Sequence, residues 1–380
     1  MIKKYVFIIY LLFLGVSFTH AQYTSVPDSN FEAYLEDNGM GDGIVDNGQV
    51  LTANIENVTE LVITNNSIAD LTGLEDFTAL EEFGLGWNSG PITHMDLSQN
   101  SNLKIVGFSY TNAISIDLSH NNQLTDLYCT QNLLLTSLIV NSPLITEIMA
   151  WENHLTYIDV TNCPALERLY INYNVYLSSL DISNNPNLIT LRCSENNLTS
   201  LDTSNNLLLE VLAIGNNPNL TSLDLSQNPL LRLFTAGHNN SMTHIDVRNG
   251  NNENFELFSA NPSTNLQCIY VDDASAPYLE DWSIPTHTQF ANNEQECQPI
   301  SVGDYQKPLF SMYPNPAKEH ITVISENSGA YKLYSSQGMV ADGIIAIGFN
   351  RIMISELITG IYFLEVETTQ GKEVKKIVKQ

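Results

Sequence analysis

LITLRCSENNLTSLDTSNN, residues Leu188 to Asn206, consists of two halves with related patterns. The first half reads L-x-x-L-x-C-x-x-N and the second reads L-x-x-L-D-x-x-x-N. In each half, inward and outward positions alternate with the period of a β-strand. Versions of this stretch recur every 21 to 24 residues, a spacing that indicates a solenoid. Ten units begin at Val58, Leu80, Leu103, Leu124, Ile145, Leu166, Leu188, Leu209, Leu231 and Phe255. One coil cannot bury its own leucines, so stacked coils must share one continuous core.

This repeat resembles the leucine-rich-repeat family, and in particular its short bacterial class, in which both halves carry an LxxL core. The resemblance covers residues 58–272 in ten coils. It implies a mostly β fold, a parallel-β solenoid, in which the strand of the first half lines the concave face.

Asparagines form two columns along the repeats. The first column is Asn66, Asn88, Asn132, Asn153, Asn174, Asn196, Asn217 and Asn239. The second column is Asn100, Asn121, Asn185, Asn206 and Asn228, with Cys163 and Gly250 as exceptions. An inward amide can both donate and accept hydrogen bonds, so we expect each column to tie the turns of neighbouring coils together.

The five cysteines divide into two groups. Cys129, Cys163 and Cys193 lie inside the repeats and are expected to be buried thiols. Cys129 and Cys193 occupy the same place three coils apart, about 14 Å, which is too far for a disulfide. Cys268 and Cys297 flank the end of the repeats and predict a disulfide that holds a C-terminal cap over residues 268–300.

An aspartate recurs at one outward place of the second half. The column is Asp96, Asp117, Asp159, Asp181, Asp202, Asp224 and Asp246, and Ile139 interrupts it. Two interpretations are open, a solvated acidic face or a row of weak calcium sites. In either case we expect the carboxylates to raise one another's pKa values.

The chain begins with features of an exported protein. Residues 1–21 combine two lysines, a short apolar run and a small-residue cut site, which predicts a signal peptide and not a membrane span. Residues 22–57 are expected to cap the first coil, and Ser29 with Glu32 predicts a capping box ahead of a short helix with Phe31 on its buried face. The stretch around Asp42 and Asp46 is a weak candidate for calcium, and no other metal or cofactor is expected.

The last residues form a different domain. Past a linker, residues 301–306, short alternating strands separated by glycine turns predict an antiparallel β-sandwich over 307–380. The motifs Tyr313-Pro314-Asn315-Pro316 and Gly360-Ile361-Tyr362 resemble those of type IX secretion C-terminal sorting domains. The resemblance implies that this segment engages outer-membrane secretion machinery and that the protein is secreted or displayed at the cell surface.

Charge limits the class of partner. Residues 22–306 hold 35 acidic residues against 5 basic ones, whereas residues 307–380 are nearly neutral. An acidic body repels phosphate, so nucleic acid and anionic membrane are not expected as partners. H-E-x-x-H, G-x-S-x-G and P-loop motifs are absent from the sequence, and we do not expect an enzyme.

Large outward residues gather in the middle coils of the first-half strands. The candidate binding residues are Tyr128, Met149, Trp151, Arg168, Tyr170, Tyr173 and Arg192. Exposed aromatic residues with arginine are typical of binding hot spots. We therefore expect a protein or glycan ligand on the concave face. Protein recognition or adhesion is the first hypothesis, carbohydrate capture for nutrient uptake is the alternative, and an unrecognised hydrolase is a third.

Overall fold

The computed structural model describes residues 22–64, 66–88, 90–297 and 309–380. The predicted signal peptide and the linker at residues 301–306 lie outside these ranges. The chain divides into two compact units, Met1–Cys297 and Gln298–Gln380, because most contacts lie within each of them. Each unit is described by itself.

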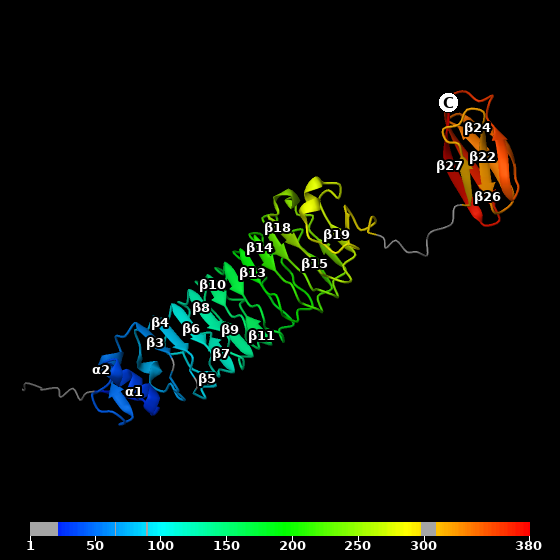
Figure 1. Ribbon diagram of the computed structural model, residues 1–380. Helices are drawn as coiled ribbons and strands as arrows, with labels where there is room; N and C mark the ends of the chain where they lie inside the picture. Colours follow the sequence, from blue (N-terminus) through cyan, green and yellow to red (C-terminus); the bar gives the residue numbers. More distant parts are fainter. Residues whose placement is uncertain (1–21, 65, 89, 298–308) are drawn as a thin grey trace, which may run out of the picture. The chain divides into compact units, whose positions relative to one another are not determined.

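The first unit is a parallel β-solenoid built on a ten-stranded sheet, as the repeats predicted (Figure 1). Its strands are β3 (Glu60–Thr64), β4 (Glu82–Gly86), β6 (Ile105–Ser109), β8 (Asp126–Thr130), β10 (Glu147–Met149), β12 (Arg168–Tyr170), β13 (Thr190–Arg192), β14 (Val211–Ala213), β16 (Leu233–Thr235) and β18 (Leu257–Ser259). Successive strands pair in register, so that each outward side chain lies beside its equivalents in the coils before and after. We call the outward side of this sheet the ten-stranded face. The resemblance to leucine-rich repeats predicted that this side is the concave surface.

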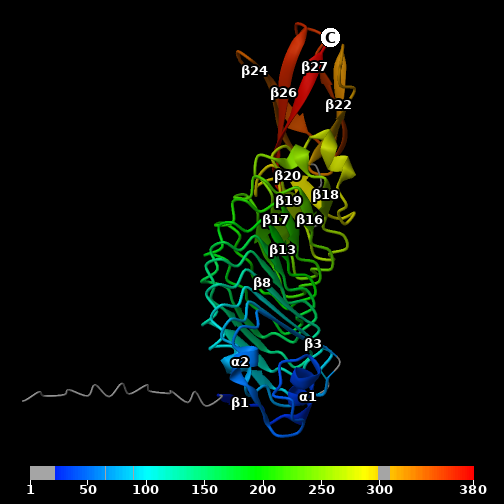
Figure 2. The same ribbon diagram turned by 90° about the vertical axis from the view of Figure 1, so that its left-hand side faces the viewer.

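The second halves of the coils form two shorter parallel sheets. The first contains β5 (His94–Met95), β7 (Ser115–Leu118), β9 (Ser137–Val140) and β11 (Tyr157–Asp159). The second contains β15 (Ser222–Asp224), β17 (His244–Asp246), β19 (Cys268–Tyr270) and β20 (Gln289–Ala291). Figure 2 shows the coils stacked one upon another, with the N-terminal helices at one end of the stack. The leucines between the sheets form one continuous core, and burial of each leucine side chain contributes about 1.5–3 kcal/mol.

Asparagines of the first column hydrogen-bond between coils, as expected. Asn174 donates from Nδ2 to the carbonyls of Ala150 and Ile171, both at 2.9 Å, and its Oδ1 accepts from the N–H of Leu155 at 3.1 Å. The column of buried amides begins at Asn88, because Asn66 is partly exposed and donates within its own coil, to the Thr64 carbonyl.

In four amides of the second column, the Nδ2 group donates hydrogen bonds but the Oδ1 atom accepts none within the described ranges. Asn206 donates from Nδ2 to the carbonyls of Ile182 and Asn185, but its buried Oδ1 has no hydrogen-bond partner among the residues that the structure describes. The same is true of Oδ1 in Asn100, Asn121 and Asn185. In Asn228, by contrast, Oδ1 accepts from the Thr203 hydroxyl of the preceding coil at 2.7 Å.

One member of this column was misassigned from the sequence. Asn249, not Gly250, continues the column, because its Nδ2 donates to the Asn228 carbonyl at 2.9 Å. Gly250 follows with a φ of 74°, a left-handed conformation that favours glycine at this turn.

The N-terminal cap contains strands β1 (Tyr23–Ser25) and β2 (Gln49–Leu51) and helices α1 (Ser29–Asp37) and α2 (Thr52–Ile55). Phe31 of α1 is buried, as expected. The predicted capping box is wrong, because Asp28 is the N-cap and accepts from the N–H groups of Asn30 and Phe31. Glu32 instead turns into the following loop, where its carboxylate accepts from the N–H groups of Asn47 and Gly48.

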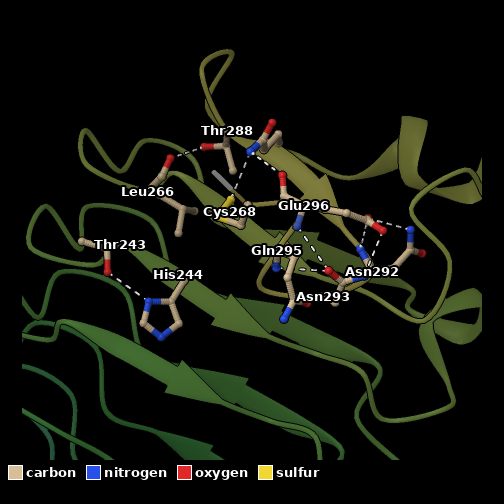
Figure 3. The surroundings of a disulfide bond; sticks show 11 residues. Thr243, His244, Leu266, Cys268, Thr288, Asn292, Asn293, Gln295 and Glu296 are labelled. Carbon is tan, nitrogen blue, oxygen red and sulfur yellow. Dashed lines mark hydrogen bonds between the residues drawn. A yellow bond between two sulfur atoms is a disulfide. The ribbon is translucent and has the colours of Figure 1, made fainter. Parts of the chain in front are cut away.

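Short 3₁₀ turns complete the first unit, η1 (Leu74–Asp76), η2 (Asn252–Asn254) and η3 (Pro277–Asp281). At the C-terminal end, Trp282 stacks on Phe258 with ring centroids 3.9 Å apart and closes the core. The predicted disulfide joins Cys268 to Cys297, with Cα atoms 6.0 Å apart. Figure 3 shows its surroundings, where the Glu296 carboxylate accepts hydrogen bonds from Asn292 and Asn293.

The second unit is an antiparallel β-sandwich. One sheet contains β21 (Phe310–Tyr313), β22 (His320–Ser325) and β25 (Gly348–Met353). The other contains β23 (Gly329–Ser335), β24 (Gly338–Ile345), β26 (Gly360–Thr368) and β27 (Gly371–Lys379). Val323 and Ile352 of the first sheet share a core with Leu333 and Leu364 of the second.

Candidate functional site

Large side chains form a row across the middle of the ten-stranded face. The register pairs Tyr128 with Met149, Met149 with Tyr170, and Tyr170 with Arg192. Ala213 and then Thr235 continue the row, so the side chains of the row become smaller after Arg192. The structure therefore brings together the sequence-predicted residues of four successive strands.

The two arginines of the predicted patch differ in their partners. Arg168 is held by two carboxylates, those of Glu147 and Glu167, each at 3.1 Å. The side chain of Arg192 makes no ion pair or hydrogen bond with any residue that the structure describes. Its guanidinium lies over the Tyr170 ring, 5.6 Å from the centroid.

Two shallow hollows meet at Arg192. The first, about 340 Å³, is lined by Met149, Trp151, Tyr170, Asn172 and Arg192, and we call it the Trp151 hollow. The second, about 380 Å³, we call the Ala213 hollow. Its lining is Asn172, Tyr173, Arg192, Ser194, Glu195, Val211, Leu212, Ala213, Leu233, Thr235 and Leu257. Of the predicted patch residues, Tyr128 and Arg168 line neither hollow. Tyr128 lies beside the glycines Gly84, Gly86 and Gly107.

A rim of residues in the left-handed conformation runs along one edge of the ten-stranded face. Each of these residues has a φ between 54° and 64° and is not a glycine. They are Trp87, Tyr110, Gln131, Glu152, Tyr173, Glu195, Asn216 and His238. The conformation turns the chain at the same corner of eight successive coils, at a cost of about 1–2 kcal/mol per residue. We did not predict this rim, although it could have been found as the place that precedes the first asparagine column.

The rim carries an aromatic pair that the sequence analysis missed. Trp87 and Tyr110 stack with ring centroids 3.8 Å apart and planes inclined by 16°. Both side chains are exposed. They are equivalent residues of adjacent coils, because β4 and β6 pair Gly86 with Ser109 immediately before them.

The aspartate column caps turns. Oδ1 of Asp181 accepts from the N–H and hydroxyl of Ser183, at 3.0 and 2.7 Å, and Asp159 does the same with Thr161. These hydrogen bonds lower the pKa values of Asp159 and Asp181. The neighbouring Asp181 does raise the pKa of Asp159, as expected, but the hydrogen bonds outweigh this effect, so the expected net increase is wrong. Calcium binding to this column stays a prediction.

The weak metal candidates lie in a hydrogen-bonded loop of the N-terminal cap. The Asp42 carboxylate accepts from the N–H of Ile44 and from Nδ2 of Asn47, both at 2.9 Å. Asp46 is a turn residue with a φ of 58°. Within the described residues, no three His, Cys, Asp or Glu side chains gather as a metal site.

The three cysteines of the repeats are free and buried. Burial raises the pKa of Cys163 to about 11, and it also raises the pKa values of Cys129 and Cys193. The thiols are therefore protonated core groups at neutral pH.

The Tyr313-Pro314-Asn315-Pro316 motif joins the start of the sandwich to its last strand. Asn315 donates from Nδ2 to the Lys376 carbonyl and accepts at Oδ1 from the N–H of Val378, both at 2.8 Å. The second motif begins β26 at Gly360, and the buried Tyr362 donates from its hydroxyl to the Ile358 carbonyl at 2.9 Å. These motif residues therefore hold the sandwich together.

Residues 311–380 match the family model described as the secretion system C-terminal sorting domain. The C-terminal unit is a type IX secretion sorting domain. A sorting domain of this kind implies export and a secreted or cell-surface location. Within the described residues, no helix is both long and apolar enough to span a membrane. No curated protein matches the chain.

Solved structures similar to the chain that carries this sorting domain include several leucine-rich-repeat proteins. The functional domain of InlJ from Listeria monocytogenes is 19% identical, with 95% of this chain and 99% of that chain covered and a TM-score of 0.35. An internalin, InlF, from Listeria monocytogenes is 18% identical, with 70% and 96% covered and a TM-score of 0.27. The leucine-rich-repeat domain of the type III effector XopL is 11% identical, with 68% and 79% covered and a TM-score of 0.39.

Proposed function

We propose that the solenoid is a protein-recognition module, exported by its sorting domain, that binds a partner through the ten-stranded face at β8 to β14. The observation that carries this proposal is the row of Tyr128, Met149, Tyr170 and Arg192 in register on four adjacent strands. Two hollows lie along this row, and Trp151 and Tyr173 stand at their sides. Aromatic and arginine side chains in such positions are the residues that contribute most to protein interfaces.

The partly exposed state of these side chains supports a role in binding over a role in the fold. The leucines alternate with them on each strand and fill the core, whereas Tyr128, Met149 and Tyr170 are only half-buried. Their removal is therefore expected to change stability little.

The test selects peptides from a random display library on the immobilised full chain. Trp151→Ala and Tyr173→Ala are each expected to lower the affinity of the selected peptides by about 1–4 kcal/mol. Tyr157→Ala on β11 is the matched control, because Tyr157 and Tyr173 are both 51% exposed but Tyr157 lies on the second-half sheet. Peptides that bind Trp151→Ala and Tyr173→Ala as well as the parent would place the site elsewhere.

A second candidate function, carbohydrate capture, is supported by the exposed Trp87–Tyr110 stack, since aromatic faces also pack against sugar rings. A glycan array probed with the full chain tests this function. Binding that is lost in Trp87→Ala and kept in Trp151→Ala would assign a sugar site to the rim.

A further inference from the structure

Arg192 is an exception among the basic residues of the acidic solenoid. Residues 22–306 contain five basic residues, and four of them make ion pairs. The pairs are Lys104 with Glu81, Arg168 with Glu147 and Glu167, Arg232 with Glu210 and Glu256, and Arg248 with Asp246 and Glu294. Arg192 has no carboxylate partner within the described residues, although 35 acidic residues share its part of the chain.

Two glutamates of the rim hydrogen-bond to amide side chains and not to Arg192. The Glu195 carboxylate accepts from the Asn216 amide, and Glu152 accepts from Nε2 of Gln131 at 3.0 Å. Within the described residues, the Arg192 guanidinium therefore has no carboxylate in contact with it. A guanidinium carries five N–H donors in a fork that matches a carboxylate, and stacking on the Tyr170 ring uses its face.

The lining of the Ala213 hollow indicates what kind of ligand group would lie beside a carboxylate bound to Arg192. The Ala213 hollow presents the aliphatic side chains Val211, Leu233 and Leu257 with the small Ala213. The aliphatic carbon favours an apolar group at this place, while the polar residues Ser194 and Thr235 of the same lining can hydrogen-bond a ligand of either kind. An apolar amino-acid side chain fits this lining.

We propose that Arg192 binds the carboxylate of an Asp or Glu in the partner polypeptide, and that an apolar side chain next to that residue occupies the Ala213 hollow. This inference rests on the proposed function, since it names the chemistry recognised at the same face. The strongly acidic solenoid selects against acidic partners as a whole, so the recognised carboxylate lies in a neutral or basic segment. Arg192 thereby determines the register of the partner.

The experiment compares display selections on the full-length parent and on Arg192→Glu, with the same random peptide library. Peptides from the parent are expected to share an Asp or Glu beside an apolar residue. The Arg192→Glu variant is expected to select Lys or Arg at that place. For single synthetic peptides from the parent selection, Arg192→Gln is expected to lower affinity roughly 10- to 100-fold, the loss typical of a hydrogen-bonded charged group. Arg232→Gln is the matched control, an arginine that already has carboxylate partners, and it is expected to leave affinity unchanged.

Each outcome decides between the two proposals. Peptides that need Trp151 but lack a shared carboxylate, and that bind Arg192→Gln as well as the parent, would overturn the role of Arg192 and leave the proposed function standing. A library with no Trp151-dependent binder would overturn both. Binding of polygalacturonate fragments that depends on Arg192, without any binding of acidic peptides, would overturn the polypeptide assignment.

Discussion

The guanidinium of Arg192 lies 5.6 Å from the centre of the Tyr170 ring, on the adjacent strand of the ten-stranded face. On the same strand as Tyr170, Arg168 is instead bound to Glu147, whose side chain is only 14% exposed. Two arginines one strand apart therefore have different roles. Arg168 compensates a poorly hydrated carboxylate, and Arg192 presents its charge to solvent.

This difference predicts unequal effects on stability. Arg168→Ala leaves Glu147 without its partner and is expected to lower the free energy of unfolding by about 1 kcal/mol. Arg192→Ala is expected to change it by less than about 0.5 kcal/mol, as is usual for an exposed side chain. Urea unfolding of both full-length variants measures the two values. Equal losses would contradict the assignment.

The Thr203 hydroxyl donates a hydrogen bond to Oδ1 of Asn228, whereas the equivalent Oδ1 atoms of four other coils have no donor among the described residues. Thr203→Val keeps the shape of the side chain but leaves Oδ1 of Asn228 unpaired, and is expected to cost about 1–3 kcal/mol. Ile182 stands in the same relation to Asn206, whose Oδ1 has no hydrogen-bond partner in the described part of the chain. Ile182→Thr is therefore expected to be much less harmful than a polar substitution in a core usually is. Thermal unfolding of the two variants checks this, and a harmless Thr203→Val would show that the hydrogen bond contributes little.

At the rim, substitution by glycine is expected to be harmless or stabilising, whereas glycine usually destabilises a folded chain. His238 has a φ of 64°, which glycine adopts without strain and a β-branched residue resists. We expect His238→Gly to leave the melting temperature unchanged or raise it, and His238→Val to lower it by an amount equivalent to about 1–2 kcal/mol. Alanine at the same position should lie between them. A valine variant as stable as the glycine variant would contradict the strained rim.

The aspartate column predicts acid sensitivity. The pKa values of Asp159 and Asp181 are lower in the folded protein than the ordinary value, because Thr161 and Ser183 donate hydrogen bonds to the carboxylates. Their contribution to stability is therefore fully present above the unfolded pKa, about 3.9, and is lost as the pH falls through the lower folded pKa. Ser183→Ala should weaken this acid dependence, and Ser137→Ala, in the coil where Ile139 replaces the aspartate, should not. Unfolding followed by circular dichroism between pH 6 and pH 2 (roughly the range over which these carboxylates titrate) tests both.

The sorting domain should depend on Asn315. Asn315→Ala removes both hydrogen bonds to β27 and is expected to destabilise the sandwich by about 1–2 kcal/mol. Export should fall as a result, measured as the fraction of the protein at the cell surface and in the medium. Ser311→Ala, exposed on β21, is the control. Normal export of a destabilised Asn315→Ala protein would separate the motif's structural role from sorting.

The sequence by itself determined the solenoid. Leucines at a fixed period have one way to leave water, which is to stack coil upon coil, and inward asparagines such as Asn174 then have backbone groups within reach above and below. The Cys268–Cys297 pairing could be predicted because these two cysteines flank the end of the repeats. The sandwich could be predicted from its alternating strands and from motifs that resemble those of sorting domains. The row from Tyr128 to Arg192 was also predictable, because period-2 alternation and coil register place it.

Tertiary structure decided what each of these side chains contacts. Asp28 rather than Ser29 caps α1 because Glu32 reaches a loop that lies 15 residues later in the chain. The aspartates hold protons less tightly than expected because Ser and Thr donors two residues away outweigh the repulsion between coils. The side chain of Arg192 is unpaired, whereas the rim glutamates Glu195 and Glu152 accept hydrogen bonds from Asn216 and Gln131. Periodicity specifies which way a side chain points, but the hydrogen bonds and charges that it meets depend on the competition among all neighbours within reach, and only the folded chain brings those neighbours together.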